Sequence, residues 1–388
     1  MKNFAAAANS RLGFLNWVII FFAIALSGLE VHAADLTGLW NNTARFQSIR
    51  DYTEMPSGHK EGFAVERPDV IINGLPTVFL YHRCFDGNLK AQICLRIYDP
   101  TVTTQHRDVG LIVSHTLGVH AAAPSVAKIN DKWTMVYEEG GGGVYWATSL
   151  DGIVWTKMGA LFSDGIIRAT PSLYVFQGVV YVFYAQFLDS SHQQLGVIFH
   201  SGSGMQNLRQ YGGGYVLKGS QSWDAGSVSM PRIVFQNGYH WMFYEGGSLN
   251  FECSPNLKQK NLMGWGIARS RDLVNWEKWS RNPIMRHDAT YSSESCGHDM
   301  PQPFISASTG KTHVFYSSND THTLKMDYLV DGNACGQSMQ YPNWKETNHQ
   351  CMPSCGAMGG TLCYSTKTCG SGTQTRLGMS HDCGSCCK

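Results

Sequence analysis

Six carboxylate side chains lie close in sequence to one repeated pattern of prolines and tyrosines. Five times, a proline is followed thirteen residues later by a tyrosine that closes an apolar run: Pro68/Tyr81, Pro124/Tyr137, Pro171/Tyr184, Pro231/Tyr244 and Pro303/Tyr316. The acidic residues in the segments that lead to these prolines or follow these tyrosines are Glu66, Glu138, Glu139, Asp224, Glu245 and Asp299. The chain has only 29 acidic residues, so this concentration at one register predicts a shared site rather than scattered surface charge.

Grouped carboxylates with aromatic rings nearby suit the cleavage of a glycosidic bond. One acid protonates the leaving oxygen, and another activates water or attacks the sugar. Crowding raises the pKa of at least one carboxyl group, which keeps a general acid protonated near neutral pH. Asp224 and Glu245 are the first candidates for the essential acids. The candidates for holding the sugar are Arg168, His120, Trp223 and His298.

Each candidate also has a structural interpretation. Any one of the acids can cap a turn or pair with Arg67, Arg83 or Arg168. His120 and His298 can be ordinary structural histidines, and Arg168 can simply neutralise the carboxylates.

The elements that must position these residues are predicted to be β-hairpins. A turn signal lies between each proline and its tyrosine: Asn73-Gly74, Asn130-Asp131, Gln177-Gly178, Asn237-Gly238 and Thr309-Gly310. The second strand of each hairpin is apolar on both faces, as at residues 135–137 and 242–244, which predicts a sheet covered on both sides. Proline is expected at the first position of the first strand, where no ladder donor is needed.

Hairpins that recur every 47 to 72 residues predict blades packed around an axis. We therefore expect an all-β fold, a five-bladed β-propeller, over residues 34–332. The segments before the prolines and after the tyrosines would then emerge at one face of the propeller. Two blades also carry a Ser, Asp and Trp pattern, which we interpret as a structural turn: Ser149/Asp151/Trp155 and Ser270/Asp272/Trp276.

The two ends of the chain differ from this repeat. Lys2 and Arg11, an apolar stretch from about Phe14 to Ala25 and the small residues near Ala33 predict a signal peptide over residues 1–33. An uncleaved anchor is the alternative, although the apolar stretch is shorter than a spanning helix needs. The expected location is secreted or periplasmic, with no membrane span once the signal is removed. The formal net charge of +1 does not indicate a polyanionic partner, so we expect no nucleic acid partner, and we expect a monomer.

Twelve cysteines in a secreted chain predict disulfides. Eight of them fall in the last 54 residues, at Cys335, Cys351, Cys355, Cys363, Cys369, Cys383, Cys386 and Cys387. This glycine- and serine-rich segment cannot build an apolar core, so residues 333–388 are expected to form a small module stapled by disulfides. Zinc fits less well because an oxidising compartment disfavours free thiolates. In the propeller, the expected pairs are Cys84/Cys94 and Cys253/Cys296.

The blade pattern resembles the five-bladed, furanosidase-like glycoside hydrolases. The resemblance rests on proline, apolar strand, Asn-Gly turn and aromatic strand ending in tyrosine, together with residues 270–276 (SRDLVNW) and 222–231 (SWDAGSVSMP). It covers about residues 60–330. That superfamily includes the family 43 arabinanases and β-xylosidases, the family 32 fructosidases and the family 130 mannoside phosphorylases. It implies a carbohydrate substrate, no required cofactor and, in some relatives, a calcium ion on the axis.

The chain departs from this resemblance directly before the prolines. Family 43 enzymes typically carry aspartate there, whereas this chain has Arg67, Ala123, Thr170, Met230 and Gln302. The catalytic base is therefore unassigned. The leading hypothesis is a secreted glycoside hydrolase acting on an oligo- or polysaccharide. The alternatives are a non-catalytic carbohydrate-binding propeller and a glycoside phosphorylase in which Arg168 and Arg83 bind phosphate.

Because most of the cysteines lie in the C-terminal segment, we predict that this segment and the propeller respond differently to reductant. Mild reduction should unfold the segment 333–388 while the propeller keeps its β-sheet, because the tail depends on disulfides and the propeller on an apolar core. Circular dichroism across a dithiothreitol titration checks this. Loss of the whole β-sheet signal at low reductant would contradict it.

Overall fold

The computed structural model describes residues 34–52, 62–72, 74–98, 106–116, 119–188, 194–248, 263–286, 298–307, 310–318, 323–331, 362–364, 376–378 and 385–387. The predicted signal peptide, Cys253, Cys296 and most of the cysteine-rich tail lie outside these residues. Within them, the prediction of an all-β fold is confirmed, and helix is confined to the short α2 (Leu36–Trp40). None of the helical segments described here is long and apolar enough to cross a membrane.

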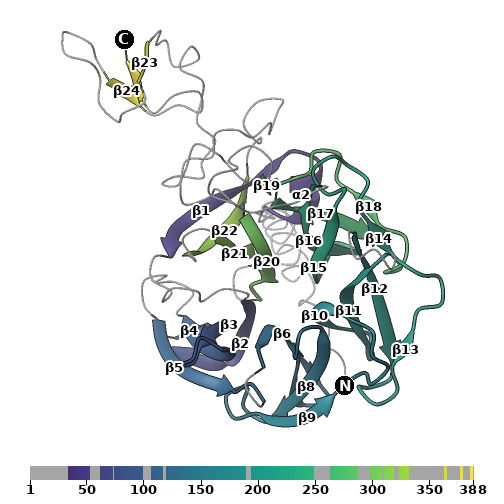
Figure 1. Ribbon diagram of the computed structural model, residues 1–388. Coiled ribbons are helices and arrows are strands. Elements are labelled where there is room, and N and C mark those ends of the chain that lie inside the picture. The colour runs from purple at the N-terminus through teal and green to yellow at the C-terminus, as the bar shows by residue number, and fades with distance from the viewer. Residues whose placement is uncertain are drawn as a thin grey trace, which may run out of the picture. The chain divides into compact units, whose positions relative to one another are not determined.

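The strands form five successive groups, which we number sheets 1 to 5 in chain order (Figure 1). Sheet 1 contains β2 (Phe63–Ile72), β3 (Leu75–Phe85), β4 (Ala91–Tyr98) and β5 (His106–Val113). Sheet 2 contains β6 (Ala121–Ile129), β7 (Lys132–Glu139), β8 (Gly143–Ser149) and β9 (Thr156–Ala160). Sheet 3 contains β10 (Ala169–Phe176), β11 (Val179–Phe187), β12 (Leu195–Gly202), β13 (Arg209–Gln210) and β14 (Leu217–Lys218).

Sheet 4 contains β15 (Ser227–Gln236), β16 (Tyr239–Gly247), β17 (Met263–Ser270), β18 (Glu277–Lys278) and β19 (Met285–Arg286). One parallel residue pair, Leu195 with Ser227, joins it to sheet 3. Sheet 5 contains β20 (His298–Ile305), β21 (Thr312–Ser318), β22 (Thr323–Asp331) and the N-terminal strand β1 (Ala44–Tyr52). In the tail, β23 (Leu362–Tyr364), β24 (Arg376–Gly378) and β25 (Ser385–Cys387) form a small separate sheet.

The innermost strands of the five sheets close into a ring. β2 contacts β6, β6 contacts β10, β10 contacts β15, β15 contacts β20, and β20 contacts β2. The ring is completed by chain segments distant in sequence, because β1 pairs antiparallel with β22. We call the end of the ring at which the innermost strands begin the N-terminal face, and the opposite end, where their hairpins turn, the turn face.

The predicted turns at Asn130-Asp131, Gln177-Gly178 and Asn237-Gly238 are confirmed, and their backbone explains the residues found there. Asn73 and Thr309 of the other two predicted turns lie outside the described residues. Asn130 and Asp131 have φ angles of 46° and 64°, and Asn237 and Gly238 have 53° and 75°. Two successive positive φ angles define the turn that matches strand twist, and Asn, Asp and Gly tolerate them best. Each hairpin then buries a tyrosine between sheets: Tyr184 packs with Val136 and Val144 of sheet 2.

The prolines lie at bulges inside the innermost strands, so the expectation that they begin these strands is wrong. In sheets 2 to 4, one extra residue interrupts the ladder at Pro124, Pro171 and Pro231. The residue before each of these prolines is left-handed, with φ of 49° at Ala123, 53° at Thr170 and 50° at Met230. In sheet 5 the equivalent pair is Met300-Pro301, with φ of 59° at Met300, and not Pro303. The longer β20–β21 turn brought Pro303 to the same spacing from Tyr316.

Sheet 1 departs from the other four. Tyr81 pairs with Phe63 without a bulge, and the ladder is irregular between Arg67 and Ile71 instead. The Tyr81 hydroxyl donates to the Gly152 carbonyl of sheet 2 at 3.0 Å, so the side chain faces the following sheet. By contrast, Tyr184 faces the preceding one. The Pro68/Tyr81 spacing is therefore numerically but not structurally equivalent to the others.

The two Ser, Asp and Trp patterns form the structural turns that we expected. The Ser149 hydroxyl accepts from the Gly152 amide at 2.8 Å, and Asp151 accepts from the amides of Ile153 and Val154. Trp155 then packs edge-on to Tyr81, with ring centroids 5.9 Å apart.

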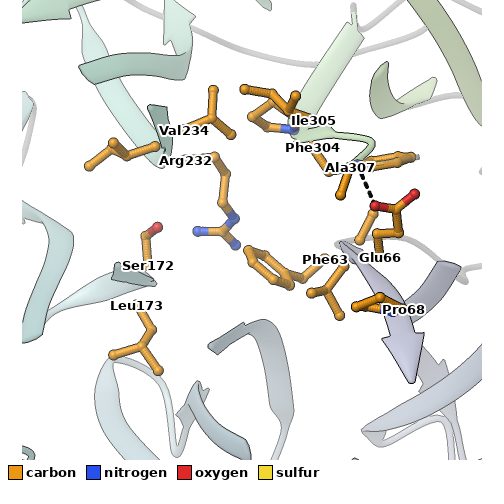
Figure 2. Close-up of a pocket in the computed structure, with 14 residues that line it drawn as sticks. Phe63, Glu66, Pro68, Ser172, Leu173, Arg232, Val234, Phe304, Ile305 and Ala307 are labelled. Carbon is orange, nitrogen blue, oxygen red and sulfur yellow. Dashed lines mark hydrogen bonds between the residues drawn. The ribbon is translucent and has the colours of Figure 1, made fainter. Parts of the chain in front are cut away.

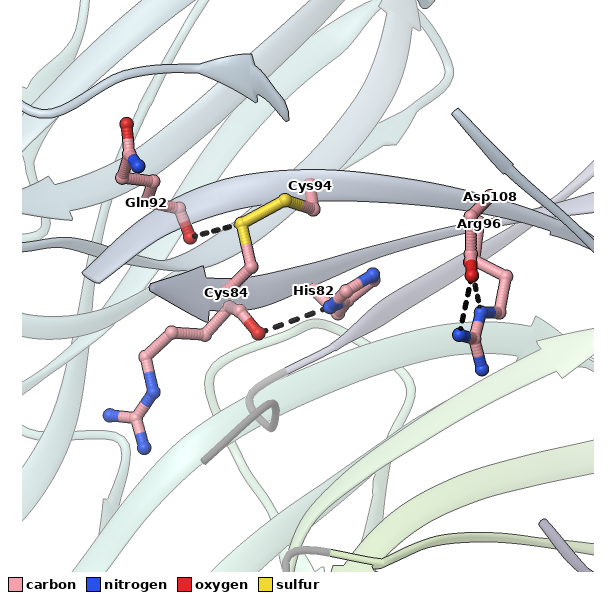
Figure 3. Close-up of a disulfide and its surroundings, with 7 residues drawn as sticks. His82, Cys84, Gln92, Cys94, Arg96 and Asp108 are labelled. Atoms are coloured by element: carbon pink, nitrogen blue, oxygen red, sulfur yellow. Dashed lines mark hydrogen bonds and ion pairs between the residues drawn. A yellow bond between two sulfur atoms is a disulfide. The ribbon is translucent and has the colours of Figure 1, made fainter. Parts of the chain in front are cut away.

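The outer part of sheet 1 carries a disulfide. Cys84 on β3 is joined to Cys94 on β4, the pair expected from the sequence (Figure 3). Arg96 and Asp108 add an ion pair between β4 and β5, with Nε to Oδ1 at 2.5 Å. These contacts tie the strands of sheet 1 together.

The left-handed conformation at Ala123 gives a stability prediction. Glycine usually costs about 0.5–1 kcal/mol relative to alanine in a strand, but relieving a left-handed alanine recovers about 1–2 kcal/mol. Ala123→Gly should therefore leave the free energy of unfolding unchanged or slightly higher. Ala127→Gly, in the same strand but with ordinary extended backbone, should lower it by about 1 kcal/mol. Urea unfolding of both variants checks this, and equal destabilisation by the two would contradict the assignment of strain.

Candidate functional site

The centre of the ring is filled by the side chain of Arg232, which follows Pro231 and is only 1% exposed. Its Nη1 donates to the carbonyls of Pro171 and Pro231 at 3.0 and 3.1 Å, and its Nη2 donates to the Pro124 carbonyl at 3.4 Å. Its Nε donates to Gln302 at 2.8 Å, and its guanidinium lies 5.7 Å from the ring centroid of Phe63. One side chain thus contacts residues of all five sheets.

Three candidate acids belong to the same ladder pair of their sheets on the N-terminal face, Glu138 and Glu245 on the second strand and Asp299 on the innermost strand. The last ladder pair before the bulge is Ala122/Glu138 in sheet 2, Ser229/Glu245 in sheet 4 and Asp299/Ser317 in sheet 5. In sheet 3 the same pair is Ala169/Ala185, which has no ionisable group. The side chains of Asp299 and His298 lie outside the described residues, so only their backbone position is established.

Hydrogen bonds connect Glu138 to Glu245 through sheet 3. Oε2 of Glu138 accepts from the Thr170 amide at 3.1 Å, and Oγ1 of Thr170 accepts from the Met230 amide at 3.1 Å. The residue before Met230 is Ser229, whose hydroxyl donates to Oε1 of Glu245 at 3.1 Å. The two carboxylates are therefore positioned by the same strained residues that precede the bulge prolines.

Asp224 is held in a buried ion pair with Lys278. It is fully buried, and its Oδ2 accepts from Nζ of Lys278 at 2.5 Å and from the Tyr244 hydroxyl at 3.3 Å. Oδ1 accepts from the amides of Ser220 and Gln221. Burial lowers the pKa of Lys278, and the contact with Asp224 opposes that shift. Both oxygens of Asp224 thus have protein partners, which favours the structural interpretation.

Glu139 occupies a comparable ion pair in sheet 2. It is 2% exposed and accepts from Nζ of Lys157 at 3.1 Å, close to the ring of Tyr137. Lys157 pairs with Ala147 and Lys278 with Ala268, which are equivalent positions on the outer strands. The sequence contained a pattern that indicates these ion pairs: in both Ser, Asp and Trp patterns, a lysine lies two residues after the tryptophan.

Glu66 lies on the other side of Arg232, towards the turn face. Its oxygens accept from the Ser306 hydroxyl at 2.7 Å and from the Ala307 amide at 2.5 Å, which joins sheet 1 to the β20–β21 turn. Glu66 and Arg232 both line a cavity of about 370 Å³ (Figure 2). Most of the wall is apolar, from Phe63, Val65, Val234, Phe304 and Ile305. The expectation that Glu66 joins the other acids is wrong, because Pro68 is not equivalent to the bulge prolines.

The candidates for holding the sugar are dispersed. Arg168 is 1% exposed and makes two bonds of 2.6 Å to Asp164, with its guanidinium over Phe162. Trp223 is 3% exposed and packs against Tyr244, with ring centroids 5.6 Å apart. His120 is exposed, and its Nδ1 accepts from the Ala91 amide at 3.0 Å. Arg168 and Trp223 are thus parts of the contacts between strands and sheets, and neither presents an open surface for a sugar.

The axial calcium ion implied by the resemblance stays a prediction. At the level of the proline carbonyls, the guanidinium of Arg232 uses the oxygens that a cation would need, and its charge disfavours a second cation beside it. Within the described ranges, no three His, Cys, Asp or Glu side chains are grouped so that they could hold a metal ion.

The fold resembles solved glycoside hydrolases. A thermostable family 43 glycoside hydrolase has a TM-score of 0.54 at 17% identity, over 74% of this chain and 97% of that one. The catalytic domain of the Coprinopsis cinerea family 62 α-L-arabinofuranosidase has a TM-score of 0.53 at 10% identity, over 76% and 99%. A structure described with the family 130 mannoside phosphorylases has 0.52 at 12% identity, over 73% and 85%.

These similarities define the class of the fold. No protein-family model matches the sequence. No curated protein matches it either. The chain has the fold of the β-propeller glycoside hydrolases, and at these identities the comparison concerns the fold alone.

The Asp224–Lys278 pair gives a direct test of its structural role. Lys278→Met should lower the free energy of unfolding by about 3–5 kcal/mol, because it leaves a buried carboxylate without its cation. Adding Asp224→Asn should recover part of this loss. Lys128→Met, which breaks an exposed ion pair with Asp131, is the matched control and should change stability by less than about 1 kcal/mol. Equal effects of Lys278→Met and Lys128→Met in urea unfolding would refute the role.

Proposed function

We propose that this chain is a carbohydrate-active enzyme that cleaves glycosidic bonds at the N-terminal face of a five-bladed β-propeller. Sheets 1 to 5 would be the blades, and the oligo- or polysaccharide would bind over the centre of the ring. One observation carries the proposal: Glu138 and Glu245 hold the same register position in sheets 2 and 4 and are linked through Thr170 and Met230. Two carboxylates at one face of the ring are the minimum that acid/base cleavage requires.

Glu138 and Glu245 replace Asp224 as the first choices for the reacting acids. Asp299 is the third, since it belongs to the same ladder pair in sheet 5, on the innermost strand opposite Ser317. One of the group would protonate the leaving oxygen, and another would activate water or attack the sugar. Glu139 and Asp224 would contribute indirectly, by fixing the sheets that carry the site.

The remaining features of the proposal come from the sequence. The signal over residues 1–33 would direct the chain to a secreted or periplasmic location. The segment 333–388 would be a disulfide module, and the protein would act as a monomer.

A non-catalytic carbohydrate-binding protein is the second candidate. It is favoured by the residues before the bulge prolines, Ala123, Thr170, Met230 and Met300, none of which can act as an acid or base. Phosphorolysis has less support, because Arg168 is already paired with Asp164 on both terminal nitrogens. A phosphate site there would have to displace a buried ion pair.

The test is turnover of a panel of oligosaccharides, measured by reducing-sugar release and followed with single variants. Glu138→Gln and Glu245→Gln should each lower kcat by about 100-fold or more, because each amide keeps the shape but removes a proton-transfer group. Glu277→Gln, an exposed acid of sheet 4, is the matched control and should leave kcat unchanged. A glycan array on the same proteins measures binding.

The outcomes separate the two candidates. Binding without turnover, unaffected by the Gln variants, would reject the enzyme and support the binding protein. Turnover that survives both substitutions would place the chemistry elsewhere in the ring.

A further inference from the structure

The contacts of Arg232 suggest a function beyond filling the centre of the ring. Its guanidinium donates to the carbonyls of three bulge prolines, from three successive sheets. We propose that Arg232 is a positioning residue for Glu138 and Glu245: it holds the proline bulges whose strained residues orient both carboxylates. This inference rests on the function proposed above.

The bulges need a hydrogen-bond donor such as Arg232, because each bulge lowers the stability of the fold in two ways. A left-handed non-glycine residue costs about 1–2 kcal/mol, and Ala123, Thr170 and Met230 are all left-handed. Thr170 is also β-branched, which makes a positive φ angle rarer still. A buried carbonyl without a donor is also unfavourable. The guanidinium binds the carbonyl of the proline after each strained residue, so it stabilises the bulges at the point of strain.

The strained residues in turn determine where the carboxylates lie. The Thr170 amide donates to Glu138, and the Met230 amide donates to Thr170. Met230 directly follows Ser229, which donates to Glu245. If the bulges relax, these amides rotate and both carboxylates lose their positions. A displacement of about 1 Å in a catalytic group can lower a rate 100-fold.

Only an arginine suits this position. Its planar fork donates to several acceptors in fixed directions, and it stays charged at every accessible pH. Lysine has three donors on one flexible nitrogen and cannot reach the carbonyls and Gln302 in the same geometry. The equivalent residues after the other bulge prolines are Ser125, Ser172 and Gln302, all buried, so one arginine serves the whole ring.

The cavity on the turn face makes the proposal testable by chemical rescue. Arg232 lines this cavity, so a small cation could enter the space left by a shortened side chain (Figure 2). Arg232→Ala should lower kcat by about 10- to 100-fold with KM within about threefold, since the acids move while most substrate contacts remain. Millimolar guanidinium should restore most of the lost kcat. Urea, which has the same shape without the charge, should not.

Two further variants keep the test decisive if Arg232→Ala does not fold. Arg232→Lys should fold and still lose kcat, because lysine keeps the charge but not the fork. Arg67→Lys is the matched control, since Arg67 is also buried, with its guanidinium over Phe79 and Trp133 but away from Glu138 and Glu245. It should lower the unfolding midpoint without changing kcat of the folded protein.

Failure of this inference differs from failure of the proposed function. If the wild type cleaves no glycan, the proposed enzyme is rejected. If the wild type is active and folded Arg232→Lys keeps its kcat, or guanidinium does not rescue folded Arg232→Ala, the positioning role is overturned. A loss of kcat that matches Arg67→Lys would also overturn it, because that result would reflect stability alone.

Discussion

The guanidinium of Arg232 is the contact on which the centre of this protein depends. It is buried with a formal charge, a state that is costly in a protein interior unless several oriented oxygens surround it. The bulges supply these oxygens by turning proline carbonyls out of the strand ladders towards the axis. Ring closure brings the proline carbonyls together. The positively charged guanidinium then stabilises this arrangement by donating hydrogen bonds to them.

Two buried ion pairs, Lys157 with Glu139 and Lys278 with Asp224, lie farther from the axis. Lys157 and Lys278 extend from equivalent outer positions to Glu139 and Asp224, each near a buried tyrosine of the same sheet. Each pair ties an outer strand to a segment near the N-terminal face. The acidic residues thus have two uses. Glu139 and Asp224, each beside a lysine and a tyrosine, support their sheets, whereas Glu138 accepts from a backbone amide and Glu245 from a hydroxyl.

This division explains why the sequence overestimated the site. Acidic residues near the repeated prolines and tyrosines looked equivalent, but side chains on successive strand positions point to opposite faces. Glu138 and Glu139 are neighbours in sequence, yet one bonds to Thr170 of the next sheet and the other to Lys157 of its own. Glu66 was grouped with them only through Pro68, whose spacing to Tyr81 does not correspond to a bulge.

The sequence alone determined the all-β class, the inner hairpins and their turns, since alternation, turn residues and apolar strands are local properties. It also contained the Trp-x-Lys pattern, but only the structure shows that these lysines pair with the buried Glu139 and Asp224. Tertiary structure decided which acids converge, because that depends on the bulge register and on which sheet each side chain faces. It alone revealed Arg232, whose partners are spread over more than a hundred residues of chain and meet only when the ring closes.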